Sequence, residues 1–351
     1  MILPSVQRVS DTRIDKVVPL VSPALLHHDL PLDDDLSATV VEGRRAVARV
    51  LDREDDRLMV VVGPCSVHDP VAALEYADRL AETAARLADD LLIVMRVYFE
   101  KPRSTVGWKG LINDPGLDGS GDVNTGLRTA RSLLLQVLRK GLPVGCEFLD
   151  PITPQYIADT VSWGAIGART VESQVHRQLA SGLSMPIGMK NRPDGAISTA
   201  VDAIRAAAVP HVFPGIDVSG TPAILHTRGN ADCHLVLRGG RGGPNYSAED
   251  VAGALALLGA AGLPERLIID ASHDNSGKDH ARQPVVAEDV AGQLAAGQRG
   301  IAGVMLESFL VPGRQDLDPT RPPAYGQSIT DACMGWDTTV QVLEGLAAAR
   351  R

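Results

Sequence analysis

The sequence predicts a closed barrel of eight parallel β-strands surrounded by helices, a (β/α)8 or TIM barrel of the α/β class. Two observations lead to this fold. Eight short apolar runs each stop at a charged or reactive residue, as expected of strands that are buried on both faces. Stretches with helical periodicity alternate with these runs, and strand–helix alternation is typical of parallel sheets. A chain of 351 residues is long enough for one such domain with a large core.

The predicted strands and helices follow one another along the chain. The strands are LMVVVGPC, LLIVMR, PVGCE, GAIGAR, PIGMK, HLVLR, LIIDASH and AGVMLE, ending at Cys65, Arg96, Glu147, Arg169, Lys190, Arg238, His273 and Glu307. Asp69 followed by proline is a helix N-cap signal and begins a helix over 71–88. Further helices are predicted over 124–140, 171–182, 196–208, 247–261, 284–297 and 330–349.

Two parts of the chain lie outside this alternation. Residues 1–57 carry no reactive strand end, so they are predicted to form an N-terminal arm and helix before a catalytic barrel at 58–351. HVFPGI is a ninth strand candidate that no helix separates from HLVLR, so 211–227 is interpreted as an inserted β-hairpin. The long connections 99–123 and 308–328 leave the carboxyl ends of strands and are predicted to be active-site loops.

Composition excludes several classes of protein. The net charge is −9 and no long basic stripe is present, which argues against nucleic-acid binding. No apolar stretch reaches the length of a membrane span, and the N-terminus lacks the apolar region of a signal peptide. The cysteines have scattered spacings that suggest no disulfide framework. These features predict a cytoplasmic protein that does not bind a membrane.

Cations end several predicted strands, at Arg96, Arg169, Lys190 and Arg238. Each alone would be read as a surface side chain, but residues at the carboxyl ends of barrel strands meet at one mouth. Like charges gathered there repel unless anions lie between them, and arginine suits phosphate and carboxylate. The loop FEKPRSTVGWKG is either a solvated basic turn or a second phosphate site, with Lys101, Arg103, Ser104, Thr105 and Lys109 as its donors. The surplus of cations over one phosphate predicts two anionic substrates.

Metal ligands are also expected at the mouth, because Cys65, His273 and Glu307 end three other runs. Thiolate, imidazole and carboxylate together suit a divalent transition metal. Asp331 in SITDAC is a fourth candidate, although it could equally be an acidic residue in the first turn of the last helix. Cys65 alone would indicate a buried inert thiol, so the metal site rests on the convergence of the three strand ends.

The chain resembles the type I 3-deoxy-D-arabino-heptulosonate 7-phosphate (DAHP) synthases from about residue 10 to its C-terminus. The resemblance rests on long motifs in a fixed order, namely VVGPCSVHDP, MRVYFEKPRSTVGWKGLINDP, GCEFLDPITPQY, SWGAIGARTVESQVHRQLASGLS, LRGGRGGPNYSA, IIDASHDNSGK, GVMLESFL and YGQSITDAC. It implies a metal-dependent (β/α)8 barrel that condenses phosphoenolpyruvate with D-erythrose 4-phosphate and releases phosphate, the first step of the shikimate pathway.

The resemblance also implies residue roles. The metal would be Mn²⁺, with Co²⁺, Fe²⁺ and Zn²⁺ as alternatives, and its ligands would be Cys65, His273, Glu307 and Asp331. Phosphoenolpyruvate would be bound by Arg96, Lys101, Arg169, Lys190 and Arg238, and the phosphate of erythrose 4-phosphate by Arg103, Ser104 and Thr105. The catalytic candidates are Lys101, Lys190, Glu147 and His273. Glu147 is expected either to hold the attacking water or to anchor a nearby cation.

Three alternatives remain open from the sequence. A metal-dependent aldolase that cleaves a sugar phosphate would need one phosphate site and would leave half of the cations unexplained. A phosphoenolpyruvate-condensing synthase with another sugar acceptor would fit the cations but not the KPRST and GARTVES context. A non-catalytic barrel that binds an amino acid would not need the complete set of ligands and cations.

The resemblance implies a homo-oligomer, dimer or tetramer, with feedback inhibition by an aromatic amino acid. Ser184 stands where phenylalanine-responsive members carry serine and tyrosine-responsive members carry glycine. FPGIDVSGTPAILHTRGN, GRGGP and RPDG depart from the enteric sequences, so tryptophan or no effector stays open. The arm at 1–57 and the hairpin at 211–227 have no catalytic role here and could build an effector pocket, or the arm could only cover apolar barrel surface.

Overall fold

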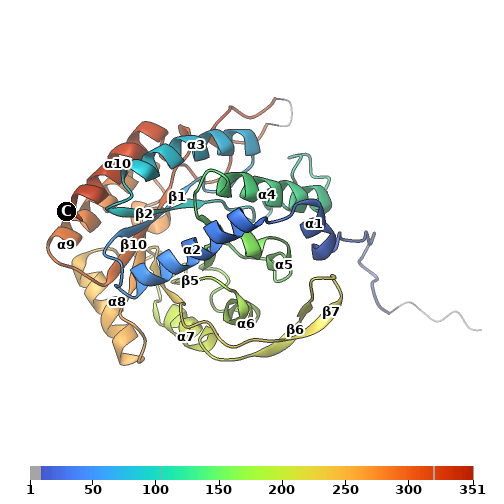
Figure 1. Ribbon diagram of the computed structural model, residues 1–351, viewed down its shortest axis with the longest axis horizontal. Coiled ribbons are helices and arrows are strands. Elements are labelled where there is room, and N and C mark those ends of the chain that lie inside the picture. The colour runs from blue at the N-terminus through green and yellow to red at the C-terminus, as the bar shows by residue number, and fades with distance from the viewer. Residues whose placement is uncertain (1–8, 104, 319–320, 351) are drawn as a thin grey trace, which may run out of the picture.

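The structure, a computed structural model, describes residues 9–103, 105–318 and 321–350. At its centre is a closed barrel of parallel strands in the order β1-β10-β9-β8-β5-β4-β3-β2 (Figure 1). These strands are Leu58–Gly63 (β1), Leu91–Arg96 (β2), Val144–Glu147 (β3), Trp163–Ile166 (β4), Ile187–Lys190 (β5), His234–Leu237 (β8), Leu267–Asp270 (β9) and Ile301–Glu307 (β10). Every residue of these strands is buried. The predicted barrel is therefore confirmed.

Helices surround the barrel and connect its strands (Figure 1). They are Pro70–Arg86 (α3), Val123–Leu138 (α4), Pro154–Ile157 (α5), Gln174–Gly182 (α6), Ser198–Ala207 (α7), Ala248–Ala260 (α8), Gln283–Ala295 (α9) and Trp336–Ala348 (α10). Asp69 caps α3 by accepting hydrogen bonds from two backbone N–H groups of its first turn, as its sequence signal predicted. The connection between β3 and β4 holds only α5 and a 3-10 turn, Ala158–Thr160.

The last helix begins later than its periodicity predicted. It starts at Trp336 rather than near residue 330. The preceding residues are extended instead, because Cys333 bridges Gly313 and Met334 bridges Ser308. Asp331 consequently lies before the helix and not in its first turn, so the helix dipole does not explain its place.

Residues before β1 pack on the barrel of the same chain. The helices here are Pro23–Asp29 (α1) and Asp34–Leu51 (α2). One face of α2 covers the closed end of the barrel, packing in a cluster with inward-facing side chains such as Met59, Trp163 and Ile268. Gly43 permits this approach, since a Cβ there would lie 2.5 Å from the Ser162 hydroxyl oxygen. The division of the chain into an arm at 1–57 and a barrel at 58–351 stays a prediction.

Two small sheets lie outside the barrel. Val212–Ile216 (β6) pairs antiparallel with Pro222–His226 (β7), and the turn between them accepts a hydrogen bond from α1, from Ala24 N–H to the Val218 carbonyl at 2.7 Å. Val311–Arg314 (β11) pairs with Gln327–Ser328 (β12). This second sheet corrects the prediction for 308–328: none of its described residues lines the mouth cavity. Backbone pairing draws the loop outward, where Tyr325 donates to Glu75 of α3 at 2.7 Å.

A buried histidine ties two barrel strands together at their amino ends. His234 Nε2 accepts a hydrogen bond from the Trp163 indole at 3.1 Å, while its Nδ1 lies 2.9 Å from the Asp232 carbonyl. Burial, with a smaller contribution from the nearby Arg266, lowers the pKa of His234 to about 3, although the hydrogen bond with the Asp232 carbonyl raises it. In the folded protein, the His234 ring is therefore neutral above about pH 3.

This histidine predicts acid sensitivity of the fold. Below pH 6.5 the unfolded chain binds a proton at His234 that the folded chain does not bind until about pH 3. As the pH is lowered through that window, the free energy of unfolding should therefore decrease, by up to about 1.4 kcal/mol per pH unit from this group. His234→Gln, which cannot titrate, should flatten the dependence of the urea midpoint on pH between about pH 7 and about pH 5. An unchanged slope would contradict the assignment.

Candidate active site

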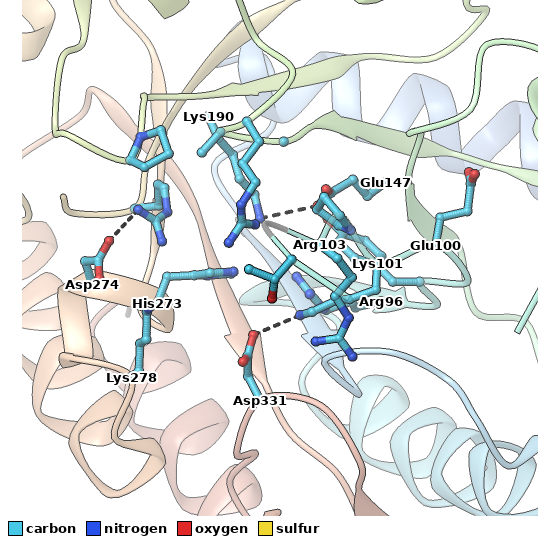
Figure 2. Close-up of a pocket in the computed structure, with 18 of the residues that line it drawn as sticks. Arg96, Glu100, Lys101, Arg103, Glu147, Lys190, His273, Asp274, Lys278 and Asp331 are labelled. Carbon is cyan, nitrogen blue, oxygen red and sulfur yellow. Dashed lines mark hydrogen bonds and ion pairs between the residues drawn. The ribbon is translucent and has the colours of Figure 1, made fainter. Parts of the chain in front are cut away.

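A cavity of about 590 Å³ lies at the mouth of the barrel (Figure 2). Its lining includes the described residues that the family resemblance assigns to the two substrates: Arg96, Lys101, Arg103, Thr105, Arg169, Lys190 and Arg238. Lys109, the further donor predicted in the loop after β2, does not line it. Glu147, His273 and Asp331 line it as well. Ser104 lies outside the described residues. The barrel topology thus brings together side chains that are far apart in the sequence.

Arg96 is held rigidly at the end of β2. Its guanidinium donates to the backbone carbonyls of Pro64 and Cys65, both at 3.0 Å, and to Glu307 Oε1 at 2.9 Å. The same group lies 3.7 Å from the centre of the Tyr98 ring, within the range of a cation–π contact. Although burial alone lowers the pKa of Arg96, Tyr98 and Glu307 raise it above its usual value. Arg96 is therefore a fixed, permanently charged group in the wall.

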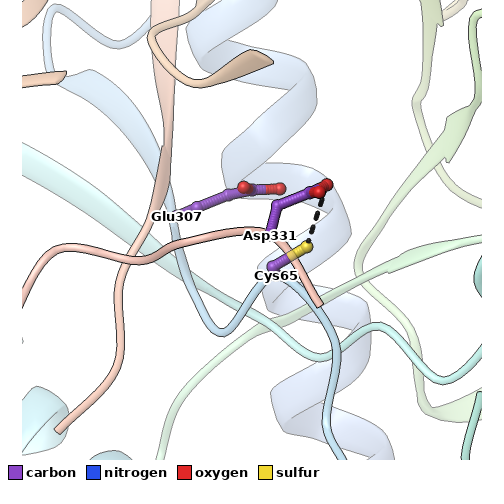
Figure 3. Close-up of side chains that lie close together, drawn as sticks. All are labelled: Cys65, Glu307 and Asp331. Carbon is purple, nitrogen blue, oxygen red and sulfur yellow. Dashed lines mark hydrogen bonds between the residues drawn. The ribbon is translucent and has the colours of Figure 1, made fainter. Parts of the chain in front are cut away.

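Cys65, Glu307 and Asp331 form a compact cluster beside the cavity (Figure 3). One ligand atom from each lies within 4.8 Å of the others. Lys101 Nζ lies 2.7 Å from Cys65 Sγ and 2.8 Å from Asp331 Oδ2. Burial and the charge of Glu307 raise the pKa of the Cys65 thiol to about 11. The thiol and the Asp331 carboxylate already face an ammonium group, so the cluster suits a cation, and a donor set of one thiol and two carboxylates fits a divalent transition metal.

His273 lies at the edge of this cluster, but it is not one of the residues whose ligand atoms all lie within 4.8 Å of one another. Its Nε2 is 3.8 Å from Glu307 Oε1, while its Nδ1 is 2.9 Å from Asp270 Oδ2. A carboxylate beside one ring nitrogen orients a histidine and leaves the other nitrogen for a metal. The geometry is compatible with His273 as a ligand, and its role stays a prediction.

Lys190, the last residue of β5, lies between two carboxylates that end β9 and β3. Its Nζ is 3.4 Å from Asp270 Oδ2 and 3.7 Å from Glu147 Oε2. Lys190, Glu147 and Asp270 are all buried. Gly167 makes room for this arrangement, because a Cβ there would lie 2.5 Å from Glu147 Oε1. The three groups form a buried cluster in which two carboxylates face one ammonium group.

The sequence analysis missed several residues of the site, namely Tyr98, Glu100, Arg241, Asp270, Asp274 and Lys278. Asp270 is the true last residue of β9, whereas His273 lies in the turn beyond it, so the strand-end rule would have found Asp270. Burial and the nearby Asp150 raise the pKa of Glu100 to about 8. The Tyr98 hydroxyl is buried and has no hydrogen-bond partner in the described part of the chain. The side chains of Tyr98 and Glu100 point inward because of the geometry of the loop after β2, which the periodicity of apolar residues in the sequence does not encode.

A second cavity of about 800 Å³ lies away from the mouth. Hairpin residues such as Phe213 and Ile224 line one side, and Leu179 and Ser184 from the end of α6 and the loop after it line another. His27 and Arg44 contribute from α1 and α2. Its size is within the range of small-molecule sites in proteins.

Comparison with known proteins bears on what this site does. The profile described as the DAHP synthetase I family matches residues 37–344. The chain belongs to the DAHP synthetase I family. It is 55% identical over 339 residues to the Escherichia coli protein named phospho-2-dehydro-3-deoxyheptonate aldolase, Phe-sensitive, covering 97% of each chain. It is 54% identical over 349 residues to the Corynebacterium glutamicum protein named phospho-2-dehydro-3-deoxyheptonate aldolase, covering 97% of this chain and 94% of that one.

A solved structure agrees with this family membership. The phospho-2-dehydro-3-deoxyheptonate aldolase of Francisella tularensis superposes with a TM-score of 0.94 at 50% sequence identity, covering 96% of this chain and 99% of that chain. The resemblance expected from the motifs is therefore confirmed, as is the barrel architecture of the DAHP synthetase I family.

Among the described helices, none is long and apolar enough to cross a membrane.

Proposed function

We propose that this chain is a DAHP synthase that condenses phosphoenolpyruvate with D-erythrose 4-phosphate and releases inorganic phosphate, the first step of the shikimate pathway, in the cytoplasm. One observation carries the proposal. A single cavity beside the cluster of Cys65, Glu307 and Asp331 is lined by the six cations that the resemblance assigns to the two substrates: Arg96, Lys101, Arg103, Arg169, Lys190 and Arg238. One phosphate would not need so many cations, whereas two anionic substrates would.

The residues divide naturally between the substrates. Arg96, Arg169, Lys190 and Arg238 come from the inner wall and would hold the carboxylate and phosphate of phosphoenolpyruvate. Arg103 and Thr105 belong to the loop after β2 at the outer rim, with Ser104 between them in the sequence, and would hold the phosphate of erythrose 4-phosphate. Holding two anions in one reactive geometry removes much of the entropic cost of the reaction.

Two buried groups would handle protons and water. Lys190 would donate a proton as the aldehyde oxygen gains charge, and Asp270 and Glu147, 3.4 and 3.7 Å from its Nζ, would hold the ammonium group in place. Glu147 would orient the water that adds to the carbon carrying the phosphate, after which phosphate leaves. Lys101 would bind phosphoenolpyruvate beside the metal ligands. Lys190 and Glu147 lie 3.7 Å apart in the same cavity lining, and general acid–base catalysis requires such groups within hydrogen-bond reach of the reacting atoms.

Cys65, His273, Glu307 and Asp331 would hold a divalent metal, most simply Mn²⁺, with Co²⁺, Fe²⁺ or Zn²⁺ as alternatives. When bound, such an ion supplies Lewis-acid polarisation of the aldehyde. The ammonium of Lys101 between Cys65 and Asp331 supports a preference of this cluster for cations.

The first test combines the reaction with its metal. Phosphate release should require both substrates, should stop after exhaustive chelation and should return with Mn²⁺. An aldolase would act without phosphoenolpyruvate, another synthase would need a different sugar, and a regulatory barrel would release nothing. Cys65→Ser should weaken Mn²⁺ binding by about tenfold or more, because the thiolate ligand is lost. Cys233→Ser, at a buried cysteine far from the cluster, is the control, and full activity without metal would refute the proposal.

A second prediction separates the two anion sites. Arg238→Ala should mainly raise KM for phosphoenolpyruvate, and Arg103→Ala should mainly raise KM for erythrose 4-phosphate. Each change should be about tenfold or more, since a hydrogen bond to a charged group contributes about 1.5–3 kcal/mol. Steady-state kinetics with each substrate varied in turn measures both effects, and Arg205→Ala on the exposed face of α7 is the control. Equal effects of both variants on both substrates would show that the division is wrong.

Feedback inhibition by an aromatic amino acid is proposed for the second cavity, with phenylalanine as the effector to test first. Its apolar lining of Leu179, Phe213 and Ile224 suits an aromatic ring, and Ser184 stands at its rim. The exposed Val17, Val18 and Ile224 are available for contacts between subunits. The homo-oligomer, dimer or tetramer, stays a prediction.

Filling this cavity should remove inhibition. Ser184→Trp should raise the half-inhibitory concentration of phenylalanine by more than about tenfold, equivalent to about 1.4 kcal/mol, while turnover stays near the unmodified level. Ala256→Trp, on an exposed position of α8 outside both cavities, is the matched control. Turnover measured with millimolar phenylalanine, tyrosine and tryptophan decides which effector acts. An enzyme that ignores all three would contradict the regulatory role.

A further inference from the structure

Arg238 carries an internal carboxylate partner inside the mouth cavity. Its Nη1 lies 2.5 Å from Asp274 Oδ2, and both residues line the cavity. Figure 2 shows Asp274 at the side of this cavity. Arg238 follows β8, whereas Asp274 lies in the 3-10 turn His273–Ser276 after β9. The pair therefore joins the ends of two neighbouring barrel strands at the place proposed for phosphoenolpyruvate.

The backbones of the two residues are fixed, so any adjustment falls on the side chains. The Arg238 carbonyl accepts hydrogen bonds from the backbone N–H groups of Asp274 and Asn275, both at 3.2 Å. The Arg238 N–H in turn donates to the Asn191 side chain at 2.8 Å. The Asp274 side chain is 24% exposed against 8% for Arg238. An anion that enters the cavity would therefore meet a guanidinium on a fixed backbone, whose neighbouring carboxylate is the more exposed of the two partners.

We infer that Asp274 is a specificity-determining counter-ion that competes with anions for Arg238. The inference rests on the proposed role of Arg238 in binding phosphoenolpyruvate. A carboxylate 2.5 Å from the guanidinium satisfies part of its hydrogen-bonding capacity and lowers the positive potential that an anion feels. Any anion that binds Arg238 must displace this carboxylate or share the guanidinium with it.

This competition favours an anion with several attachment points. Phosphoenolpyruvate carries a carboxylate and a phosphate, so it can contact Arg96, Arg169 and Lys190 together with Arg238 and offset the loss of the internal pair. Inorganic phosphate, the product, offers one compact charge and depends more on the guanidinium that Asp274 occupies. Asp274 thus selects the substrate against the product and favours release of phosphate after turnover.

The experiment compares two anions on Asp274→Asn, a substitution that keeps the size of the side chain and removes its charge. Inorganic phosphate, titrated by calorimetry into the metal-loaded enzyme, should bind about five- to tenfold more tightly, as expected when one nearby repulsive charge is lost. Phosphoenolpyruvate should gain less, about two- to threefold, so the preference for substrate over product should fall. Phosphate should also become a stronger product inhibitor in the steady state.

Glu172→Gln is the matched control, because Glu172 is also an arginine-paired carboxylate, 3.3 Å from Arg192, but does not line the cavity. It should change neither affinity. Asp274→Ser is a second variant in case the asparagine disturbs the fold. Phosphate affinity that is unchanged or weaker in both Asp274 variants would overturn the inference.

Arg238→Ala distinguishes this failure from failure of the proposed function. If Arg238→Ala weakens phosphoenolpyruvate binding while the Asp274 variants change nothing, only the counter-ion inference is wrong. If Arg238→Ala leaves phosphoenolpyruvate binding intact, the proposed role of Arg238 fails and the inference fails with it.

Discussion

Charge compensation at the mouth of the barrel is the constraint on which the rest of this structure depends. Buried cations from different strands each face an anion: Arg96 faces Glu307 at 2.9 Å, Lys190 faces Asp270 at 3.4 Å, and Arg238 faces Asp274 at 2.5 Å. An unpaired charge in such a place would cost several kcal/mol. The pairs allow the protein to bury the positive groups that two anionic substrates require. They also make the binding of those substrates an exchange of partners, in which each new contact replaces one that already exists.

The barrel is what makes this compensation possible. Parallel strands that close on themselves bring their carboxyl ends to one rim, so β2 and β10 supply Arg96 and Glu307 to the same pair although 211 positions separate them in the sequence. The apolar interior beneath the rim, which includes Met59, Trp163 and Ile268, supports these side chains from below. The closed end is covered by α2. The apolar interior and α2 therefore stabilise the amino end of the barrel, while the charged side chains lie at its carboxyl end.

Much of this arrangement could be predicted from the sequence, because the relevant signals are local. Buried strands appear in the sequence as apolar runs. Four of the predicted strand ends are the last residues of their strands in the structure: Arg96, Glu147, Lys190 and Glu307. The errors occur where a residue's position depends on a turn. His273 has a positive φ of 55° in the turn after β9, so the true strand end, Asp270, was passed over. The bridge between Gly313 and Cys333, which delays the last helix, joins positions that no periodicity relates.

The least predictable feature is the wall between the two cavities. Glu100, beside Lys101, accepts hydrogen bonds from the backbone N–H groups of Asp150 at 3.1 Å and Leu149 at 3.4 Å. The next residues of that loop, Pro151 and Ile152, line the second cavity. One buried carboxyl therefore joins the loop that carries the mouth cations to the loop that borders the proposed effector site. A ligand that shifts the second loop would change these hydrogen bonds to Glu100, and through them the neighbouring Lys101. Coupling between the two cavities therefore requires only that this loop have two positions.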